Sequence, residues 1–227
     1  MVTDVIIPAY NEEDAIANVV NALPLHLLRE IIVVNNNSSD ATTEHARAAG
    51  ATVLQEKRQG YGYACLKGIE YLIAKPDPPG IVLFIDADFS DYPGEAASIL
   101  SPIINGNADL VIGSRALGNK EKGSMTIPQI FGNWLATNLL RLIYKVQFTD
   151  LGPFRAIKFD QLVALNMQDT TYGWTVEMQL KAAKHKLRCM EVPVPYRKRI
   201  GVSKISGTVK GTVLAGYKIL YTIFKYM

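Results

Sequence analysis

The sequence predicts an α/β fold in which a mostly parallel sheet is covered by helices on both faces. Strand-like and helix-like segments alternate through the first 113 residues. Some strand-like segments are continuous apolar runs, such as residues 31–34 and 81–85, and such runs are typical of strands buried on both faces. Polar residues cluster directly after several of these segments, and open parallel sheets bind their ligands beyond the carboxyl ends of the strands.

The predicted elements follow one another in a regular order. Segments rich in β-branched residues predict strands at residues 4–8, 30–35, 51–56, 81–86 and 109–113. The segments between them predict helices at residues 12–22, 41–49, 62–74 and 93–105. Further along we expect helices at 128–146 and 173–185, a strand near 188–193, and a C-terminal helix at 207–227. Because no repeat or linker interrupts the pattern, we expect one domain over residues 1–206, followed by that helix.

Composition and charge narrow the class of protein. With 48% hydrophobic and 20% charged residues, the chain resembles an ordinary globular protein. Cys65 and Cys189 lie far apart without metal-ligand spacing, so we expect reduced cysteines and a reducing compartment. Residues 181–227 carry eleven Lys and Arg against one acid, whereas the rest carries thirteen against twenty. The excess of positive charge in the C-terminal part therefore indicates an anionic partner, such as phosphates or a lipid surface.

The strongest chemical signal is the acidic pair Asp86 and Asp88, which ends a predicted buried strand. Carboxylates two residues apart, where a strand becomes a loop, can point at one divalent ion. Mg²⁺ or Mn²⁺ held there would neutralise the charge of a departing diphosphate. Asp91 follows three residues later and has two candidate roles, joining the ion or capping the helix that begins near Pro93. We favour the cap.

Three further segments place polar turns near the same edge of the predicted sheet. Residues 7–13 leave the first strand through a proline and a polar turn. Residues 35–40 leave the second strand, and Asp40 is well placed to accept a hydrogen bond from a nucleobase N–H. Residues 58–64 supply a glycine-containing turn before a helix. This turn is not a dinucleotide fingerprint, which needs G-x-G-x-x-G directly after the first strand.

Together these motifs resemble the inverting family 2 glycosyltransferases of the GT-A fold, and most closely the dolichyl- or polyprenyl-phosphate hexose synthases. The resemblance runs from Val5 to about Ser206, and its motifs are residues 7–12, 35–41, 60–62, 86–88, 113–115 and 150–155. It implies a single GT-A, Rossmann-like domain. The chain departs from the family pattern at residues 89–91, at Pro153, and at Asn35 and Asn36, which replace an acidic pair. These departures bear on the identity of the donor and not on the reaction class.

The resemblance also implies a site. The residues expected to hold the nucleotide sugar are Pro8, Tyr10, Glu12, Asp40, Gly62, Asp86, Arg199 and Lys204. The residues expected to act in the transfer are Asp88, Arg115, Arg155 and Glu177. Asp86 and Asp88 would hold Mg²⁺ or Mn²⁺, with Asp88 as the more direct ligand, and the two arginines would bind phosphate. Residues 196–204 resemble a mobile segment that closes over the donor phosphates, with Gly201 as its hinge.

Glu177 is open to three interpretations. A carboxylate acts as the general base in many relatives whose acceptor is a hydroxyl group. A phosphate acceptor is already anionic and needs no base. In that case Glu177 positions the substrate, or pairs with a cation such as Lys181 one turn later.

Two helical segments favour contact with a membrane. The broad apolar part of residues 128–146 is either core or a surface that meets lipid. In residues 207–227, Lys210, Lys218 and Lys225 share one face, although the segment is too short and too polar for a comfortable transmembrane span. A basic amphipathic helix in the membrane interface and an ordinary helix packed on the sheet explain this segment equally well.

The sequence therefore predicts inverting transfer of a hexose from a UDP- or GDP-linked donor to a polyprenyl- or dolichyl-phosphate lipid. The protein would be cytoplasmic and peripheral at the cytoplasmic face of a membrane. The alternative within the family is transfer to a hydroxyl of a saccharide or small molecule, and a nucleotidyltransferase is an alternative from another class. A nucleic-acid-binding module would leave Asp40, Asp86 and Asp88 as bystanders, so we expect no nucleic-acid partner. The oligomeric state stays open.

Overall fold

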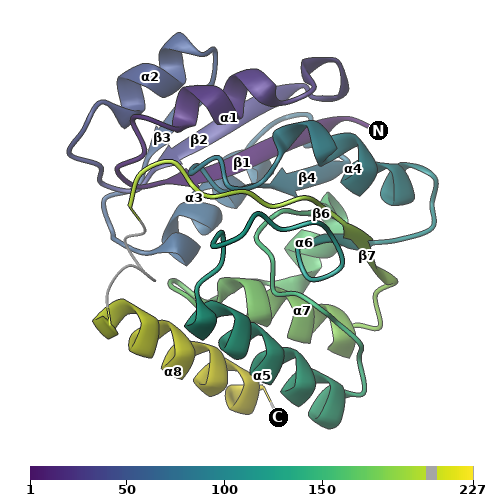
Figure 1. The fold of residues 1–227 in the computed structure, drawn as a ribbon. Helices are drawn as coiled ribbons and strands as arrows, with labels where there is room; N and C mark the ends of the chain where they lie inside the picture. The colour runs from purple at the N-terminus through teal and green to yellow at the C-terminus, as the bar shows by residue number, and fades with distance from the viewer. Residues whose placement is uncertain (203–208, 227) are drawn as a thin grey trace.

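The computed structural model describes residues 1–202 and 209–226, and its centre is a seven-stranded sheet (Figure 1). In spatial order the strands are β3 (Thr52–Gln55), β2 (Glu30–Asn35), β1 (Thr3–Ala9), β4 (Ile81–Phe84), β6 (Arg155–Lys158), β5 (Leu110–Ser114) and β7 (Cys189–Pro193). Strand β6 runs antiparallel to β4 and β5, and the other neighbours pair in parallel. The mostly parallel α/β sheet expected from the sequence is confirmed.

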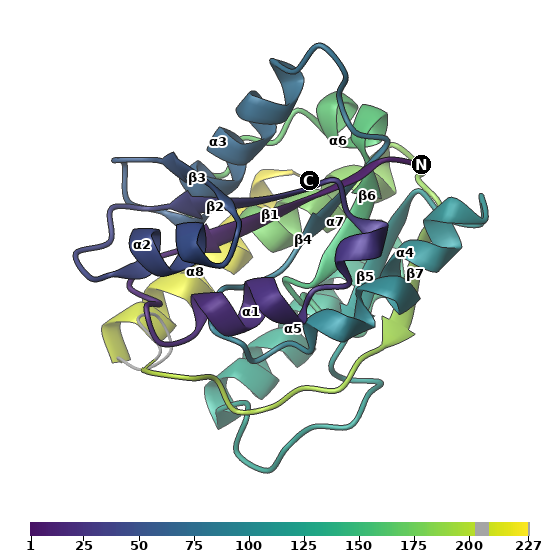
Figure 2. The same ribbon diagram turned by 90° about the horizontal axis from the view of Figure 1, so that it is seen from above.

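Helices cover both faces of this sheet (Figure 2). One face carries α1 (Ile16–Ala22), α2 (Thr42–Ala48) and α4 (Ala96–Ile104). The other face carries α3 (Tyr61–Ile73), α5 (Ile127–Tyr144), α6 (Phe159–Leu165) and α7 (Trp174–Lys184). The last helix, α8 (Val209–Lys225), lies beside α5 and also contacts α7, so it belongs to the outer layer of this second face.

The hydrophobic core is divided in two by the sheet. Along β1 and β2, Ile6 and Ile32 face one cluster, whereas Val5 and Val33 face the other. All four side chains are fully buried. Full burial of an aliphatic side chain contributes roughly 1.5–3 kcal/mol, so a strand buried on both faces gains from an uninterrupted apolar run. This arrangement explains the run Ile-Ile-Val-Val in β2.

One strand and one α-helix were missed in the sequence. Strand β6 has only four residues, Arg-Ala-Ile-Lys, and its antiparallel direction has no local signal. Helix α6, the other missed element, follows it directly. Strand β4 ends at Phe84, before the predicted end, so Asp86 already lies in the loop. Cys65 and Cys189 are unpaired, as predicted.

The C-terminal helix packs on the protein along one of its sides. Thr222 and Ile223 are buried, and Tyr144 on α5 donates a hydrogen bond of 2.8 Å to the carbonyl of Ile223. The packing alternative therefore holds for this side, although the contacts are with helices α5 and α7. Among the described helices, none has both the length and the hydropathy that crossing a membrane requires.

Candidate active site

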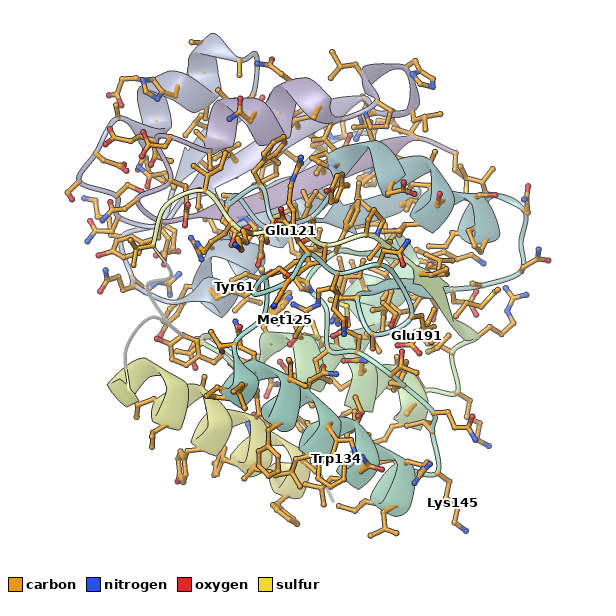
Figure 3. The ribbon with its side chains drawn as sticks, in the orientation of Figure 1. Tyr61, Glu121, Met125, Trp134, Lys145 and Glu191 are labelled. Carbon is orange, nitrogen blue, oxygen red and sulfur yellow. The ribbon has the colours of Figure 1, made fainter. Side chains whose placement is uncertain are left out.

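Two adjoining cavities open where the central parallel strands end. The first, of about 440 Å³, is lined by residues of the β1, β2 and β4 ends, the start of α3, and the segment before α7. The second, of about 300 Å³, lies between that region and the helices α5 and α8. The two cavities share five lining residues, namely Tyr61, Asp86, Asp88, Tyr172 and Arg199. Figure 3 shows Tyr61 and Met125 between the sheet and the α5–α8 pair.

Pro8 near the end of β1, and Tyr10 and Glu12 in the turn after it, line the first cavity, and their expected contact with a nucleotide sugar stays a prediction. Asn11 within this turn has φ of +52°, a conformation that Asn tolerates better than most residues. The turn is tied to the loop after β2, since the backbone N–H of Asn11 donates to Ser38 Oγ at 2.9 Å. The two strand ends therefore present one joined surface to the cavity.

Asp40 lies in the second of these joined loops, and its carboxylate holds the loops together. It accepts hydrogen bonds from the backbone N–H groups of Thr42 and Glu13, at 3.1 and 3.2 Å. Partial burial raises its pKa, but the hydrogen bonds from Thr42 and Glu13 outweigh burial and hold the pKa below its usual value. Asp40 does not line either cavity, so its expected contact with a nucleobase stays a prediction.

Asn36, at the end of β2, lines the first cavity and fixes the glycine turn before α3. Its amide donates to the Arg58 carbonyl at 2.7 Å, and its side-chain oxygen accepts from the Gly60 N–H at 2.7 Å. Gly60 lines the cavity with φ of +153°. Gly62 does not line it, and a side chain at this position would collide with the Asp169 carbonyl. Gly62 thus permits close packing of the wall.

Asp86 and Asp88 lie in the wall common to both cavities. Asp88 Oδ1 accepts from Ser90 N at 2.9 Å and Ser90 Oγ at 2.5 Å, while Oδ2 lies 3.1 Å from the Arg199 guanidinium. In the described part of the chain, the buried Oδ1 of Asp86 has no hydrogen-bond partner. Burial, and then the negative charge of Asp88, raise the pKa of Asp86 to about 7.

These two carboxylates fit a divalent cation. An unpartnered buried carboxylate oxygen is costly, and a cation would supply the missing partner. It would also offset the repulsion that raises the Asp86 pKa. The oxygen-only character of the pair matches the ligand preference of Mg²⁺ and Mn²⁺. Among the described residues, no cluster of three or more His, Cys, Asp or Glu side chains completes such a site, so phosphate or water oxygens would have to supply the remaining ligands.

Asp91 does not cap a helix, which corrects the preferred interpretation of the sequence. The short 3₁₀ helix there, η2 (Pro93–Glu95), has Tyr92 at its N-cap and receives no side-chain cap. Asp91 is instead buried, and within the described residues neither of its side-chain oxygens has a hydrogen-bond partner. Burial, and then the charge of Asp86, raise its pKa well above the usual value.

The segment after β7 covers the acidic pair. Arg199 lies 2.6 Å from Glu12 Oε1, so its guanidinium bridges Glu12 and Asp88. The Ile200 N–H donates to the Asp88 carbonyl at 3.0 Å. Arg197 packs its guanidinium on the Phe89 ring, 3.5 Å from the ring centroid. Lys204, expected in the same segment, lies outside the described residues.

Arg115 lines the second cavity, where it is held by Asp150 in a two-pronged ion pair. Its Nε and Nη2 atoms lie 2.8 and 2.6 Å from the two carboxylate oxygens. Burial raises the pKa of Asp150, but the Arg115 charge and hydrogen bonds outweigh burial and lower it. The Tyr196 ring covers the guanidinium, with its centroid 5.1 Å away. The arrangement fixes a permanent cation in the cavity wall.

Arg155 and Glu177, also expected in the site, line neither cavity. Arg155 is buried and donates to the carbonyls of Leu151, Gly152 and Thr175. Burial lowers its pKa to about 10. These bonds indicate that Arg155 stabilises the backbone next to the cavities. Its expected direct contact with phosphate stays a prediction.

Glu177, on α7, is fully buried and ion-paired with Lys181 at 2.7 Å. This contact is the pairing that the sequence offered as an alternative to catalysis. Its carboxylate also accepts from the Asp169 N–H at 2.7 Å and from the Tyr226 hydroxyl at 2.6 Å. The geometry therefore favours a structural role over that of a general base.

Several lining residues were not singled out in the sequence. Tyr61 lies inside the glycine turn that was recognised, so its position could have been inferred from that motif. Thr171 and Tyr172 precede α7 and carried no chemical signal of their own. The tertiary structure brings them to the strand ends, and only the fold reveals them.

Comparison with known proteins agrees with this geometry. The family model described as glycosyl transferase family 2 matches residues 4–163. The chain is 32% identical over 214 residues to an uncharacterised glycosyltransferase of Mycobacterium tuberculosis (strain ATCC 25618 / H37Rv), covering 93% of each chain. It is 31% identical over 215 residues to the dolichyl-phosphate hexose transferase of Haloferax volcanii, covering 92% of this chain and 89% of the relative.

A solved structure shows the same fold. Glucosyl-3-phosphoglycerate synthase from Mycobacterium tuberculosis, in complex with Mn²⁺, uridine diphosphate and phosphoglyceric acid, matches with a TM-score of 0.80. The match covers 99% of this chain and 78% of that chain at 20% identity, which supports the GT-A architecture. With the family match over most of its length, the chain belongs to glycosyl transferase family 2 and is a glycosyltransferase.

Proposed function

We propose that this glycosyltransferase moves a hexose, with inversion, from a UDP- or GDP-linked donor to a polyprenyl- or dolichyl-phosphate type lipid. The observation that carries the proposal is the position of Asp86 and Asp88 in the wall shared by two cavities. A transfer reaction needs two substrates to meet at one point, with the leaving diphosphate at that point. The acidic pair marks the point, and each cavity supplies the space for one substrate.

The first cavity is the donor site in this proposal. Its walls carry Pro8 and Tyr10 beside Asn36, which together form a mixed apolar and polar surface suited to a nucleoside. Asn36 stands where the family pattern has an acid. Its amide and oxygen are already bonded to the Arg58 carbonyl and the Gly60 N–H. We therefore expect Asn36 to shape the base pocket through the glycine turn.

The diphosphate would lie at Asp86 and Asp88, the two residues that would hold Mg²⁺ or Mn²⁺. When bound, the ion would supply positive charge to the leaving nucleoside diphosphate. Arg199 already reaches Asp88 and Glu12, so a small movement of the segment after β7 would bring its guanidinium to the phosphates. The Asp86 oxygen, which has no partner among residues 1–202 and 209–226, and the Mn²⁺ in the structurally similar synthase support this assignment.

The second cavity is the acceptor site in this proposal. Arg115 lies in its wall, and its guanidinium, which is paired with Asp150, supplies a fixed positive charge near the place where a phosphate group would lie. Pro128 and Gly132 of α5 and Gly216 and Ile219 of α8 are among its other lining residues, so the cavity continues between two helices. An acceptor with an anionic head and an apolar chain fits such a lining. The relationship to a dolichyl-phosphate hexose transferase supports the same acceptor class.

The chemistry follows from the position of the two substrates. An acceptor phosphate oxygen attacks the anomeric carbon from the side opposite the nucleotide, and a carbon–oxygen bond forms there. The bond to the diphosphate breaks, and its electron pair leaves with the nucleoside diphosphate. Since the attacking phosphate oxygen is already anionic, no proton has to be removed. This agrees with the structural role of Glu177, which lies outside both cavities.

The outer surface of α5 and α8 supports peripheral contact with a membrane at its cytoplasmic face. Large apolar side chains on these two helices are exposed, and they are Ile127, Ile130, Phe131, Trp134, Leu142, Val213, Leu214, Tyr217, Tyr221 and Phe224. Figure 3 shows Trp134 on this outer side. An exposed apolar patch of this kind marks an interaction surface, and aromatic residues are favoured at membrane interfaces. The acceptor cavity lies between the same two helices.

A ligand screen tests the donor half of the proposal. The melting temperature would be measured with UDP-, GDP- and dTDP-sugars, each with and without Mn²⁺. A ligand at 100 times its dissociation constant stabilises the folded state by about 2.7 kcal/mol, which is a rise of about 5–10 °C for a chain of this size. We expect one nucleotide class to give this rise with Mn²⁺ only. No shift with any nucleotide sugar in Mn²⁺ would contradict the proposal.

A further inference from the structure

Two polar side chains of α8, and that of Tyr226 directly after the helix, line one side of the C-terminal segment. Lys218, Thr222 and Tyr226 are spaced four residues apart, which places them on one helical face. Lys218 Nζ lies 3.1 Å from Asp169 Oδ2, and the Tyr226 hydroxyl donates to Glu177 Oε1 at 2.6 Å. Thr222 packs so closely on Gly173 that a side chain at that glycine would collide with its hydroxyl. We call this face the α8 clamp. It contacts Asp169 and Gly173 in the segment that precedes α7, and Glu177 in the first turn of α7.

The two carboxylates held by the α8 clamp in turn fold that segment. Glu177 accepts hydrogen bonds from the backbone N–H groups of Gln168 and Asp169, at 3.0 and 2.7 Å. Asp169 Oδ1 accepts from the N–H groups of Thr171 and Gly173, at 2.8 and 3.1 Å. Four backbone donors in six residues therefore depend on two buried carboxylates. Such charge-assisted bonds fix the path of a segment that has no helix or strand of its own.

The same segment forms part of the wall of the proposed donor site. Thr171 and Tyr172 line the first cavity, and Tyr172 also lines the second. The neighbouring Thr170 carbonyl accepts from the Tyr63 N–H at 3.1 Å, which joins the segment to the glycine turn. A chain of contacts thus runs from α8 through the carboxylates to both cavities. No residue of the α8 clamp lines either cavity itself.

We propose that Lys218 and Tyr226 are positioning residues, which act through Asp169 and Glu177 to set the wall formed by Thr171 and Tyr172. The inference rests on the assignment of the first cavity as donor site. The opposite side of α8 carries the exposed Val213, Tyr217 and Phe224. A contact that shifts α8 from this side would therefore change donor affinity, because coupling between two sites is reciprocal.

Tyr226→Phe tests the α8 clamp, with Tyr217→Phe as the matched control. Both variants lose one hydroxyl from the same helical region, but Tyr217 is 66% exposed and points away from the clamp. Hydrogen–deuterium exchange of peptides covering residues 168–173 measures the wall directly and needs no ligand. A hydrogen bond to a charged acceptor contributes enough that its loss should speed exchange there roughly tenfold or more. The control should match the wild type.

The second readout is the donor site itself. We expect Tyr226→Phe to weaken binding of the nucleotide found in the ligand screen, measured by calorimetry with Mn²⁺, and to raise KM for the donor more than it lowers kcat. Lys218→Gln should act in the same direction, which provides a second variant if the first does not fold. If the wild type binds no nucleotide, the proposed function fails. Hydrogen–deuterium exchange of residues 168–173 still tests whether the α8 clamp holds that segment. Unchanged exchange at 168–173 in both variants, or an equal rise throughout the chain, would overturn the inference.

Discussion

The two cavities of this protein are built in different ways. The walls of the first come mainly from loops that directly follow the parallel strands β1, β2 and β4. The second is completed by α5 and α8, which are far apart in the sequence and carry exposed apolar side chains. In the proposed assignment, the residues that bind the donor come from local sequence at the strand ends. The acceptor side depends on how remote helices pack.

The proposed donor region and the outer surface of α5 and α8 also differ in the side chains that they present. In the donor region, Asp88, Asn36 and Asp40 are each held by several hydrogen bonds, so the surface is organised before a ligand arrives. On the outer side of α5 and α8, Trp134 and Tyr217 are more than half exposed. A pre-organised polar site favours one ligand geometry, whereas an exposed apolar surface favours a class of partner. Predictions that perturb one region and not the other test this division.

The largest effect is expected at the acidic pair. Asp88→Ala removes a carboxylate from the wall shared by both cavities, and we expect the transfer rate to fall by about 10³-fold, because a group that stabilises charge in the transition state is lost. The fold should survive, since the residue lies at a strand end. Asp160→Ala, at an exposed position on α6, is the control. Undiminished activity of Asp88→Ala in EDTA would remove the metal role from this pair.

The next effect concerns stability on the acceptor side. Asp150→Asn leaves the Arg115 guanidinium without its buried partner, and loss of one partner of a buried pair costs about 3–5 kcal/mol. The pKa of Asp150 is lowered in the folded state, so the ion pair stabilises the fold above the unfolded pKa of about 3.9, and this stability is lost as the pH falls through the folded value. The difference between variant and wild type should therefore shrink below about pH 4. Denaturant unfolding at several pH values measures it, and a difference independent of pH would contradict the account.

A smaller effect on turnover is expected at Glu177. Because its carboxylate is buried away from both cavities, Glu177→Gln should lower kcat by less than about tenfold, whereas loss of a general base would cost about 10²–10⁴. Its ion pair with Lys181 is lost, so unfolding should become easier. Measuring both kcat and the melting temperature separates an effect on turnover from an effect on stability. A collapse of kcat with an unchanged melting temperature would restore the catalytic interpretation and favour a hydroxyl acceptor.

The smallest effect on the free energy of unfolding is expected for substitutions on the outer side of α5. The same substitutions should weaken binding to membranes. Phe131→Ser together with Trp134→Ser removes exposed apolar area, so stability should change by about 0.5 kcal/mol or less. Binding to vesicles that contain anionic lipid should weaken roughly tenfold, since shallow burial of aromatic side chains supports interfacial binding. Ile104→Ser, at an exposed position on α4, is the control. Equal vesicle binding by the wild type, the double variant and the control in a flotation assay would contradict the proposal that this surface binds a membrane.

The sequence located the residues that line the first cavity better than those that line the second, and the reason is physical. Apolar runs fixed β1, β2 and β4, and parallel pairing then brings Tyr10, Asn36 and Asp86 to one edge. Tyr172 could not be placed, because its position depends on the packing of α7 and α8. Strand β6 was missed, because four residues with two cations carry no alternation signal. Asp91 was misassigned as a cap, since local sequence does not show that the segment after β7 covers it.

The acceptor can be tested directly by offering two lipids that differ in one group. Polyprenyl phosphate and the matching polyprenol would be presented in vesicles with Mn²⁺ and radiolabelled UDP-glucose or GDP-mannose, and lipid-linked sugar would be measured. The account predicts transfer to polyprenyl phosphate with one of the two donors, no transfer to polyprenol, and loss of the product with Asp88→Ala. Transfer to polyprenol or to a soluble hydroxyl compound, with none to the phosphate, would contradict the proposed function.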